Sequence, residues 1–348
     1  AKTLTITNAV TVPTTKIVSF TGTDDVSAET LTLTGGMTLN GSTAELNITG
    51  DNTTAMVVSG TVTAGVDGAV LDVDASSTIT AVNMTTTSGD LTLEVATGKT
   101  LTTTVDVNAN TLTLSQAGTV STVQVDTAGG VVDVDESMTI TAVNGSQNFT
   151  IDVASGKTLT TTATIAANTL TLTGTGAVSR IDATTGTITD NGGTTVSDLR
   201  ATFGSGGTFT WGGTGSGTIT TLANALPGAG ETLNKVGTGT LTIASGFTTA
   251  FANAAGVKLD IDAGTVVLGS AGTNDDVTFN DDADEITVAS GATLTTYGSF
   301  SVGAAGTNVN LDAAAGSTIN LSSNAGAETI TGAADDDYNL LGTVNING

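Results

Sequence analysis

Apolar residues and threonine alternate along almost the whole chain. In residues 31–34, 91–95 and 241–243, Leu, Val or Ile takes every second position and Thr or Glu takes the positions between. A period of two places the apolar side chains on one face of a β-strand and the polar side chains on the other. Pairs of Gly, Asn, Asp or Ser separate these segments, as is typical of short strands joined by tight turns. The alternation therefore predicts an all-β fold.

The chain also contains an internal repeat. The triplet Asp-Val-Asp that starts at Asp72 recurs at Asp133, and the pentapeptide Gly-Lys-Thr-Leu-Thr that starts at Gly98 recurs at Gly156. A repeat of roughly 60 residues corresponds to two or three coils of a β-solenoid. It also matches a small β-sandwich domain, although sandwiches are normally larger and richer in aromatic residues. We expect an elongated β-solenoid, with tandem β-sandwich domains as the alternative.

Composition changes near residue 190. Residues 1–190 form a Thr-rich region that holds the duplication, with copies at 72–130 and 133–188. Residues 191–348 contain most of the aromatic residues, a Gly-rich run and an acidic loop, so we place a soft boundary between the two regions. Two short helix-compatible pieces, 222–226 and 247–253, are expected to form single turns or loops.

The missing residue types exclude several function classes. The 348 residues include no His and no Cys, which removes His-containing catalytic triads, His or Cys metal ligands and disulfides. Eight Lys and Arg stand against 33 Asp and Glu, giving a net charge of −25, which argues against nucleic acid and against anionic membranes. No apolar run is long enough to span a bilayer as a helix. We therefore expect a protein that is not an enzyme and does not insert into membranes.

The N-terminus suggests export. The chain begins at Ala1 instead of Met and lacks the basic and apolar segments of a signal peptide. Alanine is a residue that signal peptidase leaves at the start of a mature protein. We therefore expect a secreted or cell-surface protein whose signal peptide has been removed.

One segment resembles a known family. The sequence Leu-Asn-Lys-Val-Gly-Thr-Gly-Thr-Leu-Thr-Ile at 233–243, followed by a Gly-Thr-Val-Val-Leu strand within 259–269, resembles the autotransporter-associated β-strand repeat. Members of that family occur in exported β-helical passenger domains of bacterial surface proteins. The resemblance covers about a tenth of the chain and implies a bacterial, exported, β-helical surface protein.

Clustered acids suggest a cation site. Ca²⁺ takes six to eight oxygen ligands from carboxylates and carbonyls. The candidate ligands are Asp275, Asp276, Asp281, Asp282, Asp284 and Glu285. The run 335–337 is a second acidic cluster, and the alternative for both is a set of charged turns that keeps the surface solvated. No cofactor is expected, with Ca²⁺ as the one exception.

Other polar and aromatic residues have a structural and a functional interpretation. Asp72 and Asp74, like Asp133 and Asp135, lie two residues apart on one side of a strand, a spacing loosely compatible with glycosidase carboxylates. Because both repeat copies contain the pair, a structural ladder is favoured. Trp211 could stack on a sugar, but a single Trp among glycines is more often part of a core.

Both ends of the chain have the pattern of strands. The candidate assembly strands contain Thr3, Leu4, Thr5 and Ile6 at the N-terminus, and Val344 and Ile346 at the C-terminus. Solenoid ends that lack a cap can join head to tail. We therefore predict a structural subunit of a bacterial extracellular filament, sheath or surface layer, with further copies of itself as partner. The alternatives are a surface adhesin that binds glycans through an aromatic patch at residues 203–211 and Tyr297, and a polysaccharide-acting β-helix enzyme.

Overall fold

The computed structural model describes most of the chain. The described residues are 2–22, 29–50, 55–85, 89–201, 207–223, 230–247, 256–271, 276–279, 283–298, 300–302, 309–322, 330–331 and 337–347. They fall into two compact units, residues 1–164 and residues 165–348. The composition change near residue 190 falls at the end of a strand of the second unit.

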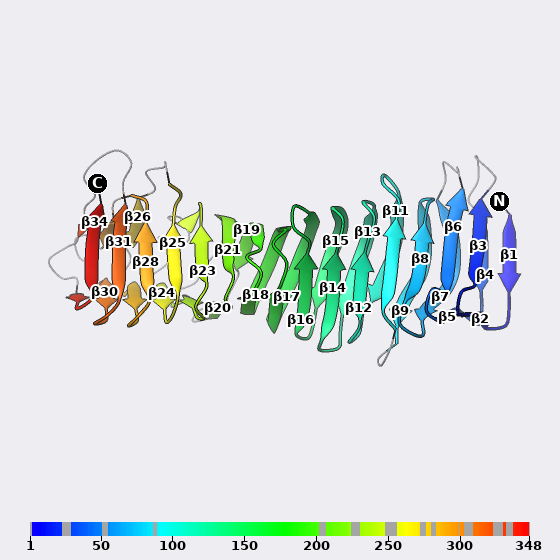
Figure 1. Ribbon diagram of the computed structural model, residues 1–348, viewed down its shortest axis with the longest axis horizontal. Helices are drawn as coiled ribbons and strands as arrows, with labels where there is room; N and C mark the ends of the chain where they lie inside the picture. Colours follow the sequence, from blue (N-terminus) through cyan, green and yellow to red (C-terminus); the bar gives the residue numbers. More distant parts are fainter. Residues whose placement is uncertain are drawn as a thin grey trace. The chain divides into compact units, whose positions relative to one another are not determined.

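Unit 1 consists of short strands joined by turns (Figure 1). These strands are β1 (Thr3–Ile6), β2 (Val10–Pro13), β3 (Ile17–Gly22), β4 (Thr30–Leu33), β5 (Met37–Asn40), β6 (Glu45–Gly50), β7 (Met56–Ala64), β8 (Ala69–Val73), β9 (Ser77–Met84), β10 (Leu91–Val95), β11 (Thr100–Asp106), β12 (Thr111–Leu114), β13 (Thr119–Val125), β14 (Gly130–Val134), β15 (Met138–Gly145) and β16 (Phe149–Val153). Strand β17 (Thr158–Leu172) runs across the division between the units.

Unit 2 is built in the same way (Figure 1). Its strands are β18 (Ala177–Asp190), β19 (Thr195–Ala201), β20 (Thr208–Gly212), β21 (Ser216–Leu222), β22 (Thr232–Lys235), β23 (Thr240–Ile243), β24 (Lys258–Ile261), β25 (Thr265–Leu268), β26 (Val277–Phe279), β27 (Glu285–Val288), β28 (Thr293–Thr296), β29 (Phe300–Val302), β30 (Asn310–Ala313), β31 (Thr318–Ser322), β32 (Ile330–Thr331), β33 (Asp337–Leu340) and β34 (Thr343–Asn347).

Strands pair in parallel with strands that lie one coil further along the chain. In unit 1, β8 pairs with β10 and β12 with β14, and in unit 2, β25 pairs with β28 and β28 with β31. Parallel pairing of successive coils makes each unit a β-solenoid, which confirms the all-β fold predicted from the alternation and the solenoid predicted from the internal repeat. Among the described residues, no helix has the length and hydropathy needed to cross a membrane.

The core consists of stacked columns of aliphatic side chains. Leu241, Val266, Leu294 and Ile319 are in register in successive coils of unit 2, and each is at most 2% exposed. The threonines that alternate with these residues along each strand point to the outside, because alternate side chains of a strand lie on opposite faces. The column is held by side-chain burial and by the ladder of backbone hydrogen bonds.

The sequence repeat corresponds to three coils of unit 1. Asn83 and Asn144, which occupy equivalent places in the two copies, lie in one column with Asp106 and Gln124 between them. Gly98 and Gly156 also match, since both adopt a φ near +75°, at +76° and +73°. Glycine accepts this left-handed conformation without steric cost, so both copies turn at the same point.

Coil length varies along the chain. Near the N-terminus Thr3 pairs with Thr30, and near the C-terminus Asn310 pairs with Asp337, so the chain advances equally far in both coils. In the repeat region Thr119 pairs with Thr139, which is a shorter advance. The advance from Ile17 to Glu45 in the first coil is slightly longer, and that from Thr318 to Thr343 in the last coil is slightly shorter. Both end coils therefore exceed the coils of the repeat and are similar in length to each other.

The two helix-compatible pieces of the sequence are described only at their starts. Leu222 closes strand β21, and residues 224–226 lie outside the described residues. Phe247 is buried, and residues 248–253 also lie outside the described residues.

Candidate functional site

The predicted assembly strands form the first and last coils. Thr3, Leu4, Thr5 and Ile6 make up β1, which pairs with β4. Val344 and Ile346 lie in β34, which pairs with β31. No second partner strand is present for β1 or β34 within the described residues, so each strand keeps one open edge. An open edge is a template for pairing with another strand.

Core-facing side chains are uncovered in both of these coils. Leu4 pairs with Leu31 in a core column, yet Leu4 is 56% exposed and Leu31 only 3%. Ile346 pairs with Leu321 in another, yet Ile346 is 59% exposed and Leu321 is 0% exposed. Every large hydrophobic residue that is exposed in the described part of the chain lies in the first coil or the last. The set is Leu4, Ile17, Tyr338, Leu340, Leu341 and Ile346.

The strands at the two ends differ in charge. Residues 1–22 contain Lys2 and Lys16 and no acidic residue, and Asp24, Asp25 and Glu29 follow before β4, whereas residues 330–348 contain three aspartates and no cation. Lys2 lies 3.7 Å from the carboxylate of Glu29 but remains largely exposed, and Lys16 is exposed. Asp337, at the start of β33, is also exposed.

The described members of the predicted calcium site have structural partners. Asp284 is fully buried, and its Oδ1 accepts a hydrogen bond of 2.9 Å from the Val257 N–H. Glu285 forms an ion pair with Lys258 in the neighbouring coil. Asp276 is described, while Asp275, Asp281 and Asp282 lie outside the described residues. Within the described residues no group of three or more acids could hold a metal ion, and calcium binding stays a prediction.

The paired aspartates belong to the outer faces of stacked coils. Asp72 pairs in register with Asn47 on one side and with Glu94 on the other. Burial, followed by the nearby charges of Asp74, Glu94 and Glu45, raises the pKa of Asp72 to about 6. Oδ1 of Asp72 and Oδ1 of Asn47 are both buried acceptors with no hydrogen-bond donor in the described part of the chain.

The second copy of the aspartate pair has a different surrounding. Asp133 pairs with Thr113 and with Asp152, and burial together with Asp135 and Asp152 raises its pKa. The column of Asp133 runs through Thr113 and Thr92 to Val70 on β8. Asp72 lies two residues beyond Val70 on that strand, so the two aspartates belong to different columns. The two copies therefore do not create one repeated carboxylate geometry.

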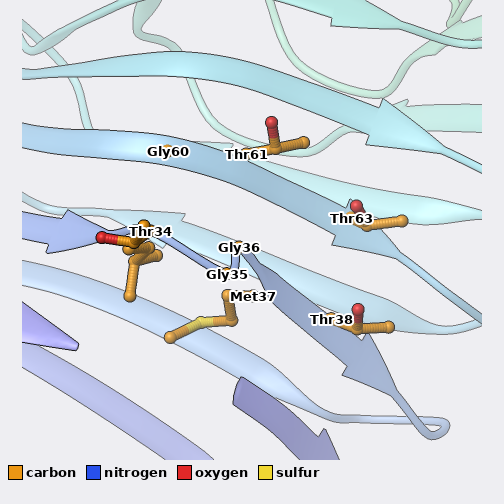
Figure 2. Close-up of a pocket in the computed structure, with 9 residues that line it drawn as sticks. Thr34, Gly35, Gly36, Met37, Thr38, Gly60, Thr61 and Thr63 are labelled. Atoms are coloured by element: carbon orange, nitrogen blue, oxygen red, sulfur yellow. The ribbon is translucent and has the colours of Figure 1, made fainter. Parts of the chain in front are cut away.

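A hollow of about 320 Å³ opens in unit 1 where β7 passes the corner between β4 and β5 (Figure 2). Strand β7 pairs with both strands, and its bend includes Gly60, where a Cβ would lie 2.4 Å from the Leu33 carbonyl oxygen. Figure 2 shows the side chains of Thr38, Thr61 and Thr63 on the same side of these strands. The residues that line the hollow carry hydroxyl and backbone groups but no acid or base, so they offer no proton-transfer group.

The aromatic residues of the expected glycan patch are mostly in the core. Trp211 and Phe209 are each 1% exposed, and Trp211 is in register between Ile188 and Lys235. Tyr297 is half-buried, and Phe203 lies outside the described residues. Trp211 therefore fills the core of its coil and has no face open to a sugar.

Buried polar groups at the coil corners were not predicted from the sequence. Lys235, which belongs to the segment that resembles the autotransporter repeat, is 1% exposed. Its Nζ donates to the carbonyl oxygens of Val236 at 2.7 Å and Gly237 at 2.8 Å, and burial lowers its pKa. Asp190 is fully buried and accepts a hydrogen bond of 2.8 Å from the Gly193 N–H. The Gly-containing turns after both residues were the available signal, since such turns leave backbone groups that need partners.

Comparisons of the chain with family models, with curated proteins and with solved structures found no match.

Proposed function

We propose that this protein is a non-enzymatic structural subunit that assembles head to tail into an extracellular filament, sheath or surface layer. The last coil of one copy would stack on the first coil of the next, so that parallel strand pairing continues across the junction. The resemblance of residues 233–269 to repeats of exported surface proteins supports the extracellular location.

The observation that carries the proposal is the exposure of core-facing side chains at both ends. Leu4, Tyr338, Leu340 and Ile346 occupy positions that are buried in every neighbouring coil, and burying such side chains contributes about 1.5–3 kcal/mol each. A further coil stacked on either end would bury them. A second copy of the chain offers such a coil with aliphatic side chains at matching positions.

Similar coil length supports a head-to-tail junction. The chain advances equally far from Thr3 to Thr30 and from Asn310 to Asp337, so the first and last coils are close to each other in length at these strands. A shorter coil, such as those of the repeat region, would leave part of either end uncovered. Because the two ends are different surfaces, their contact is heterologous. Such an interface continues into a filament when it does not close into a ring.

The charged residues at the two ends favour the same head-to-tail orientation. Lys2 and Lys16 of the first coil would approach the exposed Asp337 of the last coil, whereas head-to-head contact would oppose lysines to lysines and tail-to-tail contact would oppose one Asp337 to another. Complementary charge of this kind favours one orientation and suppresses the others.

The experiment uses the 348-residue chain and two variants that each block one end. Leu4→Arg places a charge on the first coil and Ile346→Arg places one on the last. We expect the unmodified chain to form concentration-dependent polymers in analytical ultracentrifugation and electron microscopy, and each variant to stay monomeric alone. A mixture of the two variants should form dimers and nothing larger, because each partner keeps one working end.

Thr5→Arg and Asn345→Arg are the matched controls. Each changes the outward-facing neighbour of the test residue on the same strand, so polymerisation should survive. Unmodified chains that remain monomeric at all concentrations would overturn the proposal. So would polymers formed by Leu4→Arg or Ile346→Arg, or a mixture of the two that fails to dimerise.

A further inference from the structure

Five strands of unit 2 present a regular, outward-facing array, here called the threonine face. Strands β23, β25, β28, β31 and β34 lie side by side in Figure 1 and pair in that order. One column of the array consists of Thr240, Thr265, Thr293, Thr318 and Thr343. The second column consists of Thr242, Val267, Thr295, Asn320 and Asn345.

The spacing of the threonine face repeats in two directions. None of the four pairings contains a register shift. Neighbouring strands of a sheet are about 4.8 Å apart, and alternate residues of one strand are about 6.6 Å apart. The corresponding Thr-rich strands of unit 1 lack this regularity, since the pairings β7–β9, β9–β11 and β11–β13 each contain a register shift.

The threonine face carries no charge, although the whole chain has a net charge of −25. All ten of its residues are Thr, Val or Asn. Asn345 donates to Asn320 at 2.8 Å and Asn320 donates to Thr295 at 3.3 Å, so polar groups of one column also bond along the column. A β-branched side chain is restricted at χ1, which keeps the hydroxyl and methyl groups of a threonine column in rows.

The other row of strands in the same coils is charged. Strands β24, β27, β30 and β33 present Lys258, Asp260, Glu285, Asp312 and Asp337 to the outside, and we call this row the acidic face. Carboxylates hold their own oriented water and counterions, which do not follow the repeat of the backbone. The protein can therefore order the water above the threonine face but not the water above the acidic face, although both faces cover one core.

We propose that the threonine face binds ice. A surface that is uncharged and periodic in two directions matches a ligand that is itself a lattice, and the hydroxyl groups can hydrogen bond to water while the methyl groups fill the gaps between water molecules. The repeat between neighbouring strands of the face is close to a distance between oxygen atoms in hexagonal ice. A crystalline polysaccharide fits less well, because sugar rings are commonly held by aromatic side chains and the face has none.

Rigidity favours this function. Ordering a binding surface costs conformational entropy, and a side chain with one free χ angle on a parallel ladder has little entropy left to lose. Four of the five strands, β23, β25, β28 and β31, also keep their outward residues half-buried, which limits the motion of these side chains. The face is therefore organised before the ligand arrives.

The test measures thermal hysteresis and inhibition of ice recrystallisation by the full chain. We expect both activities in the unmodified protein and their loss in Thr293→Tyr, because a bulky ring at the centre of the array holds ice away from the neighbouring threonines. The matched control is Thr287→Tyr, which places the same ring on β27 of the acidic face in the same coil and should keep both activities. Thr293→Ser keeps the hydroxyl and removes the methyl group, and partial loss is expected.

Circular dichroism and thermal melting establish that each variant is folded before it is compared. An unmodified protein without ice activity overturns the proposal, and so does equal loss in Thr287→Tyr and Thr293→Tyr. If Thr293→Tyr instead dissociates a lateral complex of the chain that has no ice activity, the face is an interface between copies and the proposal is also overturned. The Leu4→Arg variant, which blocks end-to-end assembly, should keep its ice activity, so this test is independent of the proposed assembly.

Discussion

The threonine face and the acidic face of unit 2 share one core and differ in their outward chemistry. Each face is a ladder of parallel strands with buried aliphatic residues at alternate positions, as at Leu294 on β28 and Ile286 on β27 of one coil. The outward positions do not touch the core, so the fold accepts either Thr or Asp there. The comparison teaches that the core determines the coil, while the outward columns are free to acquire a function.

The two faces differ in electrostatic cost. Burial raises the pKa of Asp260, and the neighbouring Asp262 and Glu285 raise it further, against the opposing effect of Lys258. The threonine face has no titratable group among its ten residues. Only the acidic face should therefore make the stability of its coils depend on pH and salt.

The largest expected effect is one that both faces share. Leu294→Ala and Ile286→Ala each leave a cavity in the same buried layer, and each should lower the free energy of unfolding by about 3 kcal/mol. Urea denaturation followed by circular dichroism measures the loss. If one substitution costs far less than the other, the two faces do not rest on an equally packed core.

A new carboxylate should separate the faces. Thr287→Asp would place a charge directly between Asp260 and Asp312, whereas Thr293→Asp would place one between Thr265 and Thr318. Like charges directly opposite each other are destabilising, and we expect Thr287→Asp to cost about 1 kcal/mol more than Thr293→Asp. The difference should shrink in high salt. Equal costs at low salt would contradict the electrostatic contrast.

A smaller, pH-dependent effect is expected at Asp72 on strand β8 of unit 1. Its folded-state pKa of about 6 lies above the ordinary value of 3.8, so the folded state binds the proton more tightly than the unfolded state does. The resulting stability is fully present below the ordinary pKa and is lost as pH rises through about 6. Asp72→Asn should therefore raise the melting temperature at neutral pH, by about 2 °C, and leave it unchanged in acid.

In Asp72→Asn, the new side-chain amide at position 72 also supplies a hydrogen-bond donor next to the buried Oδ1 of Asn47, the residue in register with position 72. Melting curves of both proteins across the pH range provide the measurement. A gain of the same size in acid and at neutral pH would mean that packing, and not ionisation, is responsible.

The smallest effect is expected at the Lys258–Glu285 ion pair on the acidic face. Both side chains are partly exposed, at 45% and 32%, and such pairs contribute about 0.5 kcal/mol. Lys258→Gln should lower the free energy of unfolding by about that amount at low salt and by less at high salt. A loss as large as that of Leu294→Ala would show that this cation is essential for the acidic face.

Much of the fold was predictable from local pattern. The alternation at residues such as 91–95 indicated strands, and the recurrence of Gly98 at Gly156 indicated stacked coils, because both signals depend only on neighbouring residues and on turn geometry. The buried polar corners were not predictable in the same way. Lys235 and Asp190 sit among backbone groups of their own turns and adjacent coils, and a sequence pattern does not tell which turn closes around a side chain.

The candidate sites also differ in how far the sequence alone predicted them. The strand character of both termini was visible in the sequence, but the exposure of Leu4 and Ile346, and the similar length of the terminal coils, required the register of pairing. The core position favoured for Trp211 is confirmed, and the alternative of an exposed aromatic patch is contradicted at Trp211 and Phe209, which are each 1% exposed.

By itself the sequence determined that this chain forms β-strands, that those strands bury aliphatic side chains on one face, and that its surface is acidic and without His or Cys chemistry. These properties follow from residue type and a period of two, which act over a few residues. Tertiary structure alone decided which threonines stand in one column, which carboxylates face each other and which core residues remain uncovered. Those outcomes depend on how far the chain advances in each coil, which is less at Thr119 than at Thr3 or Asn310, and the turns between strands set that advance.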